Sequence, residues 1–401
     1  MNILVTVEDL RIGGAQTFAL RLAQALHTAG HNVYIYNHYV HLVNEGLVRQ
    51  LAPTVPVLSY GADAPTYDWL LRKADGLGRR LGLGSALRER RVVRHLKQTI
   101  QRLGPEVVNS HTIKADYTAA KALEGLGVPL VITMHGCYEL FLHNTAAPEV
   151  TPKGNYALQQ AAALVYLTAK NLEIFGQAGV RSLASLPHRQ IYNGFDGKFS
   201  VEKPQYTRAT LDIPADAKVF GMVARGIPEK GWRHAIDSFM ALEGTHSELY
   251  LVLIGESDYL TELKVRHQHP RIHFIGFSHN PIDWVDIFDV GLLPSYFHAE
   301  SLPNSIAEYL FCGKPVIASC IGEVPAMLES VQGLAGVLLD QANWQLTDPN
   351  QLTEAMRVYL TQPLLLAEHQ RRALLAFEKF RMDHCLVAYE ELFHRVQRAQ
   401  S

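Results

Sequence analysis

Two glutamates, Glu300 and Glu308, have the spacing that a site for a long polar ligand would need. They lie eight positions apart, and Pro303 with Asn304 between them is suited to begin a helix. Along a helix this spacing separates the carboxylates by up to ~12 Å, about the length of a sugar diphosphate that runs back to a ribose. One carboxylate could accept hydrogen bonds from a sugar and the other from the ribose.

The residues between the two glutamates would meet the phosphates of such a ligand. A helix amino terminus presents backbone N–H groups and favours negative charge. The residues at this position are Ser301, Leu302, Pro303 and Asn304. The alternative interpretation is a surface helix that carries two solvated glutamates.

Two cations have a spacing that suits the same ligand. Arg225 and Lys230 follow an apolar run at 218–224, with four residues between them. A diphosphate leaving group gains negative charge as its bond to a sugar breaks, and two cations would stabilise it. Ordinary surface charge is the alternative.

Near the amino terminus, Gly13 and Gly14 follow the first apolar run and precede a helical stretch that opens at Thr17. Glycine allows close approach of the backbone to a phosphate at a helix start, although such pairs also form plain tight turns. The full GxGxxG fingerprint and the P-loop motif are both absent from the sequence. His135 directly follows another apolar run, at 129–134, where a lone histidine is often structural.

Short apolar runs that alternate with amphipathic stretches must position these side chains. Twelve runs are typical of buried parallel strands, at 2–7, 32–37, 106–110, 129–134, 164–168, 189–193, 218–224, 248–254, 271–275, 289–294, 315–319 and 336–339. They predict an α/β protein with two Rossmann-like, doubly wound domains that face a central cleft. We expect the domains over residues 1–200 and 206–375, with a Gly- and Pro-containing junction at 193–205 and only helices after 351.

Composition excludes several classes of protein. The chain has 401 residues, 48% of them hydrophobic, and a formal net charge of −2, which argues against disorder and against a dedicated nucleic-acid binder. Four scattered cysteines without a CxxC pair predict a reduced compartment and no zinc site, and the other histidines lack the spacing of metal ligands. The amino terminus has the pattern of a first strand and not of a signal peptide, and no apolar stretch reaches the ~18 residues of a membrane span.

The neutral total hides an uneven distribution of charge. Residues 1–200 hold 20 basic and 14 acidic side chains, and the rest of the chain holds 17 and 25. Residues 72–102 alone contain ten Lys or Arg and two acids, with Leu81, Leu83, Leu87, Val92 and Leu96 interleaved. This stretch predicts either a basic amphipathic helix that lies on anionic lipid or a solvated helix face with a loop. Nucleic acid fits less well, because no aromatic stacking platform accompanies the charges.

Several motifs together resemble those of the retaining family-4 glycosyltransferases. The segment ESLPNSIAEYLFCGKPVIASCIGEVP (300–325) resembles the family's E-x7-E motif. Other matching pieces follow in the family's order: GGAQ (13–16), TMHG (133–136), YNGFD (192–196), ARGIPEKG (224–231), LVLIGE (251–256) and HFIGF (273–277). The resemblance implies the GT-B fold, an acceptor-binding first domain, a donor-binding second domain, and a last helix (380–401) that crosses back to the first.

The resemblance also implies roles for individual residues. Glu300 would contact the donor sugar and Glu308 the ribose, and main chain near Gly276–His279 would recognise the base. His135 would hydrogen-bond a sugar hydroxyl, with His111 behind it. Gly255-Glu256-Ser257 replaces the family's Gly-x-Gly, which weakens the expectation of phosphate contacts in that loop.

The expected activity is metal-independent, cofactor-independent transfer of a sugar from a nucleotide diphosphate sugar. UDP is favoured over GDP, and the acceptor would be a glycan or a lipid-linked molecule in cell-surface polysaccharide or glycolipid synthesis. We expect a cytoplasmic enzyme, with peripheral contact to the inner face of the membrane through residues 72–102. A nucleotide-sugar epimerase of the same fold and a non-catalytic nucleotide-sugar sensor remain the alternatives.

Overall fold

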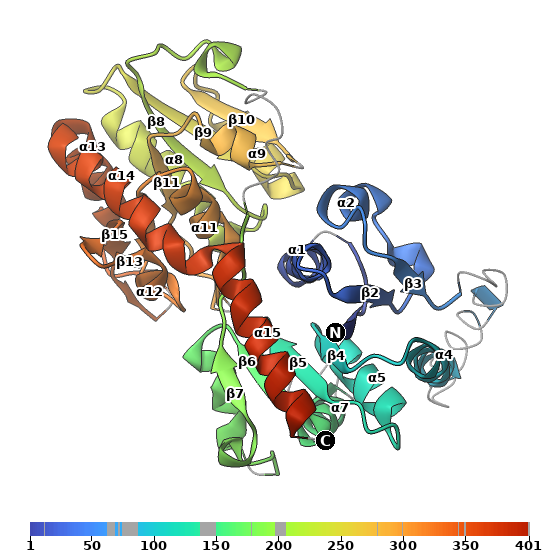
Figure 1. Ribbon diagram of the computed structural model, residues 1–401. Helices are drawn as coiled ribbons and strands as arrows, with labels where there is room; N and C mark the ends of the chain where they lie inside the picture. The colour runs from blue at the N-terminus through green and yellow to red at the C-terminus, as the bar shows by residue number, and fades with distance from the viewer. Residues whose placement is uncertain are drawn as a thin grey trace. The chain divides into compact units, whose positions relative to one another are not determined.

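The computed structural model describes residues 1–11, 13–61, 69–70, 73, 87–136, 150–177, 179–196, 206–278, 280–298, 300–343, 345–348 and 350–399 (Figure 1). The chain divides into two compact units. The first is formed by Met1–Phe195 together with Met382–Ser401, and the second by Asp196–Arg381. The junction expected at 193–205 lies largely outside the described residues. What each unit binds stays a prediction.

A fully parallel sheet of seven strands forms the centre of the first unit, in the order β3-β2-β1-β4-β5-β6-β7. The strands are β1 (Asn2–Val7), β2 (Asn32–Asn37), β3 (Val57–Ser59), β4 (Val107–Ser110), β5 (Leu130–Met134), β6 (Ala163–Tyr166) and β7 (His188–Gln190). The order reverses between β1 and β4, which pair directly through Ile3 and Val107. Ligands of doubly wound sheets bind outside the carboxyl ends of the strands at such a reversal.

The sequence predicted six strands for this sheet and missed β3. This edge strand has only three residues, Val57–Ser59, and pairs with β2. Pro56 stands directly before it, and its pattern is too short to be distinguished from a loop. The expected count is therefore corrected to seven.

Helices cover both faces of this sheet. They are α1 (Gly14–Thr28), α2 (Glu45–Leu51), α4 (Leu87–Leu103), α5 (Ile113–Leu123), α7 (Val150–Gln160) and α15 (Met382–Arg398), with 3-10 turns η1 (Val40–Leu42), η2 (Ala169–Gly176) and η3 (Leu183–Ser185). Helix α1 begins at Gly14, three residues before the expected Thr17, and buries Phe18, Leu22 and Leu26. The last helix, α15, belongs to the first unit, where Tyr389 is fully buried.

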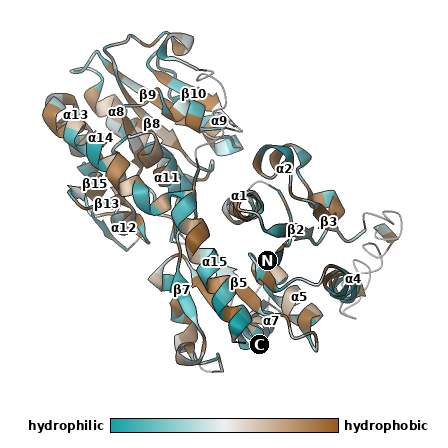
Figure 2. Ribbon diagram, viewed as in Figure 1, coloured by the Kyte–Doolittle hydropathy of each residue, from teal (hydrophilic) through white to brown (hydrophobic). Residues whose placement is uncertain are grey.

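Helix α4 corrects the expectation of an apolar face that is available for lipid. Its Val92, Leu96 and Ile100 are buried in the hydrophobic core of the first unit. The surface that it leaves outside is strongly polar, and Figure 2 shows α4 as a predominantly hydrophilic helix. Leu81 and Leu83 lie outside the described residues. Leu87, the first residue of α4, is 54% exposed, so any contact of α4 with a membrane would be mainly electrostatic, with this one leucine at its start.

The second unit has a fully parallel sheet of six strands in the order β10-β9-β8-β11-β12-β15. These are β8 (Lys218–Val223), β9 (Leu249–Ile254), β10 (Ile272–Gly276), β11 (Val290–Leu293), β12 (Val316–Ser319) and β15 (Gly336–Leu339). The reversal falls between β8 and β11, which pair through Val290 and Phe220. The predicted class, two α/β domains each with a parallel sheet, is thus confirmed.

Helices also surround the second sheet. They are α8 (Trp232–Leu242), α9 (Asp258–Arg266), α10 (Ile282–Val285), α11 (Asn304–Phe311), α12 (Val324–Leu328), α13 (Gln351–Thr361) and α14 (Pro363–Phe377), with turns η4 (Arg208–Leu211), η5 (Pro228–Lys230) and η6 (Glu378–Phe380). Two small antiparallel hairpins, β13 (Glu329–Ser330) with β14 (Gly333–Leu334) and β16 (Gln341–Ala342) with β17 (Gln345–Leu346), complete the unit. Its core forms around Trp232, Phe239 and Met356.

Candidate functional site

A buried ion pair lies beyond the reversal of the second sheet. Lys230 ends η5, which follows β8, and its ammonium contacts the carboxylate of Glu300, in the loop between β11 and α11. The two residues are only 6% and 7% exposed. The hydroxyl of Ser295 donates to the same carboxylate oxygen at 2.9 Å. Buried charges need such partners, because each has lost its hydration.

Glycines allow the backbone to bring these two side chains together. Gly231 follows Lys230 with a φ of +86°, and a Cβ there would lie 2.1 Å from the carbonyl oxygen of Pro294 at the end of β11. Gly322 has a φ of +54°, and a Cβ there would lie 2.4 Å from the carbonyl oxygen of Glu300. Any other residue at either position would push the backbone apart. The glycines thus hold the η5 turn and the Glu300 loop at close range.

Arg225 joins the pair through an aromatic ring. Its guanidinium lies 5.0 Å from the centre of the Phe297 ring, and the Lys230 ammonium lies 5.2 Å from the same ring. The carbonyl of Arg225 accepts a hydrogen bond from the indole N–H of Trp232 at 3.0 Å, which fixes the backbone of this residue. The structure therefore brings Arg225, Lys230 and Glu300 together, with two cations beside one carboxylate.

Burial lowers the pKa of the Lys230 ammonium, and the charge of Glu300 opposes this effect. A desolvated cation interacts more strongly with an incoming anion than a solvated one does, because the local dielectric constant is low. The arrangement favours binding of an anionic group by Lys230 with Arg225, which is exposed at the rim.

Helix α11 begins at Asn304, as the sequence predicted from Pro303 and Asn304. Ser301 is buried just before the helix, and among the described residues its hydroxyl has no hydrogen-bond partner. Leu302 is half-buried. Glu308 lies on α11 itself and is half-buried. Its expected contact with a ribose stays a prediction.

Gly276 ends β10 with a φ of +87°, and its carbonyl accepts a hydrogen bond from the N–H of Gly255 at 3.0 Å. The ends of β9 and β10 are therefore adjacent at these two glycines. His279 lies outside the described residues. A role for this loop in recognising a base stays a prediction.

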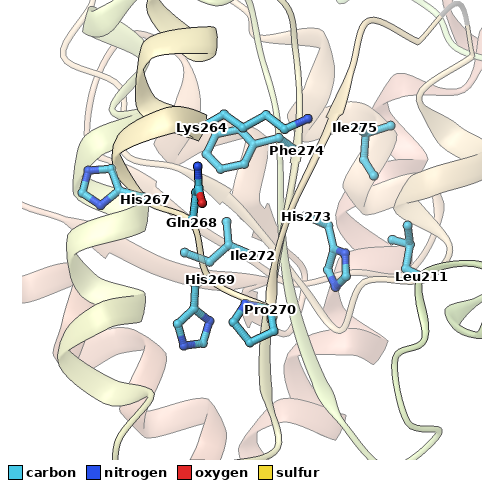
Figure 3. A pocket seen from close by; sticks show the side chains of 10 residues that line it. All are labelled: Leu211, Lys264, His267, Gln268, His269, Pro270, Ile272, His273, Phe274 and Ile275. Carbon is cyan, nitrogen blue, oxygen red and sulfur yellow. The ribbon is translucent and has the colours of Figure 1, made fainter.

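A cavity of about 550 Å³ lies along β10 (Figure 3). Its walls come from residues of α9, β10, the loop between them and the turn before β8, namely Leu211, Lys264, His267, Gln268, His269, Pro270, Ile272, His273, Phe274 and Ile275. Neither the Lys230–Glu300 pair nor Arg225 lines it. This cavity is therefore separate from the charged cluster.

The first unit holds a second polar cluster, at the carboxyl ends of β4 and β5. The rings of His111 and His135 stack, with His111 Nδ1 3.0 Å from His135 Nε2. Phe18 of α1 packs against both rings, with ring centres 5.9 and 5.6 Å away. Helix α1, which begins at the predicted Gly14 after Gly13, thus lies beside His135. Burial lowers the pKa of His135 to about 3 and that of His111 well below its usual value, so both rings are neutral near pH 7.

Sequence reasoning missed several residues that hold these clusters. Ser295 and Phe297 contact the charged residues of the second unit, and Asn109, Thr133 and Tyr389 lie behind the histidines. One signal was available, because Asn109 is a polar residue in the apolar run at 106–110. The partner on α15 is 256 positions from Thr133, and no local pattern links them.

Comparison with known families identifies the chain. Residues 12–196 match the family model described as Glycosyltransferase Family 4, and residues 217–362 match the model described as Glycosyl transferases group 1. The chain belongs to the family-4 glycosyltransferases. The resemblance that the motifs indicated is thereby confirmed.

Curated relatives of this glycosyltransferase are distant. The 2-deoxystreptamine glucosyltransferase of Streptomyces kanamyceticus is 24% identical over 258 residues, which is 58% of this chain and 65% of that protein. The D-inositol 3-phosphate glycosyltransferase of Streptosporangium roseum is 27% identical over 260 residues, 59% of this chain and 58% of that protein. The matches span less than two thirds of the length of these relatives.

Solved structures share the fold of this glycosyltransferase over its whole length. HepE of Anabaena, determined in complex with UDP-glucose, has a TM-score of 0.74 at 22% identity and covers 98% of this chain and 100% of its own. Sucrose-phosphate synthase of Thermosynechococcus elongatus has a TM-score of 0.74 at 16% identity and covers 99% of each chain. These likenesses confirm the GT-B fold.

No three His, Cys, Asp or Glu side chains in the described part of the chain gather closely enough to hold a metal ion. Among the helices that the structure describes, none combines the length and apolar character needed to cross a membrane.

Proposed function

We propose that this glycosyltransferase moves a sugar from a nucleotide diphosphate sugar to a glycan or lipid-linked acceptor, with retention of configuration at the anomeric carbon. The observation that carries the proposal is the buried pair of Lys230 and Glu300, with Arg225 beside it. Two cations and one carboxylate at the carboxyl ends of β8 and β11 match a ligand that joins a diphosphate to a hydroxyl-rich ring. UDP-sugars are favoured and GDP-sugars are the second choice.

In the proposed reaction the bond between the anomeric carbon and the β-phosphate oxygen breaks, and its electron pair stays on that oxygen. Lys230 and Arg225 stabilise the charge that develops there. Glu300 accepts hydrogen bonds from hydroxyls of the donor sugar, and Glu308 from those of the ribose. This assignment gives the neutralising role to side chains of the chain and needs no metal ion or cofactor.

Retention follows if the acceptor oxygen forms its new bond on the face that the phosphate leaves. The proton of the acceptor hydroxyl then passes to the departing β-phosphate, so no protein base is required. His135, which is neutral near pH 7, contributes a hydrogen bond to a sugar hydroxyl. Backbone groups of 301–304 and of Gly13 and Gly14 bind polar parts of the substrates.

Relatives support the class of substrate. HepE was determined with UDP-glucose bound. Another relative, the O-antigen biosynthesis glycosyltransferase WclY of Escherichia coli, is 24% identical over 223 residues. These names favour a nucleotide sugar as donor and synthesis of a cell-surface polysaccharide or glycolipid as the setting.

We further assign α4 a peripheral contact with anionic lipid on the cytoplasmic face of the membrane. Arg90, Arg91 and Arg94 are exposed on this helix. Each cation near an anionic surface contributes ~1 kcal/mol. Because Val92 and Leu96 are buried in the core, this contact involves mainly charge, and Leu87 at the start of the helix is an exposed apolar side chain beside it.

The test begins with a thermal-shift panel of UDP-, GDP- and ADP-sugars, since a ligand that binds the folded state raises its apparent stability. The stabilising donor, carrying a radiolabelled sugar, is then incubated with the purified protein and a membrane extract. Label in a new glycoside with the anomeric configuration of the donor supports the proposal. Label in an isomeric nucleotide sugar would instead indicate epimerisation, and the absence of turnover would indicate a sensor.

A further inference from the structure

A chain of hydrogen bonds runs behind His135 and ends at the side chain of Asn109. His111 Nε2 lies 2.7 Å from Asn109 Oδ1, and His111 Nδ1 lies 3.0 Å from His135 Nε2. Asn109 is wholly buried on β4, and His111 is 1% exposed. This series of hydrogen bonds therefore lies out of reach of solvent, and the protein determines which of its nitrogen atoms carry a proton.

The orientation of the Asn109 amide is fixed at its other end. Its Nδ2 donates to the backbone carbonyl of Val131 at 3.0 Å and to Thr133 Oγ1 at 3.0 Å. A carbonyl oxygen can only accept, so the nitrogen of the amide must face Val131 and the oxygen must face His111. Thr133 Oγ1 also shares a hydrogen bond with the hydroxyl of Tyr389 on α15, at 3.0 Å.

The fixed orientation of Asn109 determines which nitrogen of His111 is protonated, and His111 in turn determines which nitrogen of His135 is protonated. Because Asn109 Oδ1 is an acceptor, His111 Nε2 carries the proton. A neutral imidazole has only one N–H, so His111 Nδ1 is an acceptor and takes its hydrogen bond from His135 Nε2–H. The one N–H of neutral His135 is then used, and its Nδ1 is left with a lone pair.

Among the described residues, this last nitrogen faces no hydrogen-bond partner. His135 Nδ1 is buried and has no hydrogen-bond partner among the described residues. A buried acceptor left unpaired costs free energy, and such groups persist mainly where a ligand or a water completes them. Because Nδ1 has no proton to donate, its partner must be a donor. A hydroxyl fits this requirement, and a phosphate oxygen does not.

We propose that Asn109, acting through His111, holds His135 in the Nε2–H tautomer, so that His135 Nδ1 is an acceptor for a substrate hydroxyl. Asn109 and His111 are positioning residues in this arrangement, and His135 is the residue that contacts substrate. The tautomer assignment stands on the geometry of the free protein. The identity of the hydroxyl rests on the proposed function, since a sugar substrate supplies it.

The tautomers can be read directly from the free protein by ¹⁵N NMR of the histidine rings, because protonated and unprotonated ring nitrogens differ widely in chemical shift. At pH 7 we expect both His111 and His135 to carry their proton on Nε2. A wild-type spectrum with the proton of His135 on Nδ1, or with a mixture of tautomers, overturns the proposal. This measurement needs no variant and no ligand.

Variants test whether Asn109 and His111 hold His135 in the Nε2–H tautomer. Asn109→Leu removes the acceptor, and His111→Phe keeps a ring against Phe18 while it removes both nitrogens. In each we expect a mixture of His135 tautomers and a fall in transfer rate of about tenfold or more. Ser110→Ala is the matched control, because Ser110 is buried on the same strand and its hydroxyl has no described partner. A single Nε2–H tautomer of His135 in both variants, as in the control, contradicts the proposal.

Binding of ligands tests whether His135 Nδ1 accepts a hydrogen bond from a substrate hydroxyl. UDP-glucose should shift the His135 Nδ1 resonance if the hydroxyl belongs to the donor, and glucose alone should shift it if the hydroxyl belongs to an acceptor. UDP alone should leave it in place. A shift with UDP alone, or the absence of a shift with both bound UDP-glucose and bound glucose, overturns the hydroxyl assignment. Failure of every donor in the thermal-shift panel to bind counts against the proposed function and leaves the tautomer result from the free protein standing.

Discussion

Lys230 and Glu300 neutralise each other before any ligand arrives. Each buried charge has the other as its main partner, with Ser295 as a third member. A donor that binds as proposed offers each residue a better partner. Its diphosphate contacts the ammonium of Lys230, and its sugar hydroxyls contact the carboxylate of Glu300. The desolvation of the pair has then already occurred in folding, and binding exchanges partners without burying a new unpaired charge.

This view predicts that both members are needed for transfer. Lys230→Ala and Glu300→Gln should each reduce the rate of transfer by at least ~100-fold, because contacts of this kind to a developing charge contribute ~3 kcal/mol. Initial rates with saturating donor measure the effect. Arg233→Ala is the control, since Arg233 is exposed on α8 and pairs with Asp237. Near-wild-type rates in either variant would remove that residue from the site.

His38 predicts how the stability of the protein depends on pH. It is 2% exposed, and burial, with the nearby charge of Lys114, lowers its pKa to about 3. Between pH 6.5 and pH 3 the unfolded chain therefore binds a proton that the folded chain does not. The free energy of unfolding falls as the pH decreases through this window, by about 2 kcal/mol at pH 5.

Urea unfolding at pH 7 and pH 5 measures this loss. His38→Leu should lose less stability over the same interval, and His394→Gln, at an exposed position of α15, should behave as the wild type. An equal loss in the His38 variant would show that this ring is not responsible.

Among the elements, those with long apolar strands were predictable and those defined by contacts across the fold were not. The runs at 2–7 and 218–224 became β1 and β8, because four or five consecutive buried residues leave a clear pattern. The three residues of β3 leave none. The ion pair of Lys230 with Glu300 joins positions 70 residues apart, and its closeness depends on Gly231 and Gly322, whose φ values are not visible in a motif.

Helix α4 shows the same limit and leads to a prediction about membranes. The sequence displayed an apolar stripe and a basic stripe, and only the structure shows that the first is used inside the unit. Arg88 also stacks on the ring of Tyr39 at 3.8 Å, so its removal would disturb packing as well as charge. The informative variant is thus the triple substitution of Arg90, Arg91 and Arg94 by Gln.

That triple variant should bind anionic liposomes more weakly than the wild type, and the difference should shrink at high salt because screening weakens both. Co-sedimentation with liposomes of anionic and of neutral lipid measures it. Arg233→Gln with Arg266→Gln, on exposed faces of α8 and α9, should leave binding unchanged. Absence of binding by the wild-type protein would contradict the membrane proposal.

For the molecule as a whole, the chain leaves the first unit after Phe195 and returns to it at Met382. The two crossing points are joined, because the N–H of Met382 donates to the carbonyl of Phe195 at 3.1 Å. The Arg21 guanidinium lies 4.6 Å from the centre of the Phe195 ring and anchors this point to α1. The contact with α15 explains why the motif YNGFD has a glycine at position 194.

Gly194 is where that contact is tightest. A Cβ there would lie 2.7 Å from Met382 Sδ, 2.8 Å from Cys385 Cβ and 2.9 Å from Met382 Cα, and the last of these is backbone that cannot rotate away. Gly194→Ala should therefore loosen the start of α15 and lower the free energy of unfolding by about 1–3 kcal/mol, as overpacking does. Hydrogen exchange of the α15 amides and urea unfolding measure the two effects.

Gly176→Ala is the matched control, because a Cβ at Gly176 meets nothing within 4 Å. If Gly194→Ala were as stable as this control and its α15 amides exchanged as slowly, the two crossing points would not be held together through Gly194. If the amides of α15 alone exchanged faster while those of the rest of the first unit stayed protected, the junction would stabilise only the last helix. Loss of protection throughout the first unit would instead make α15 part of its cooperative core.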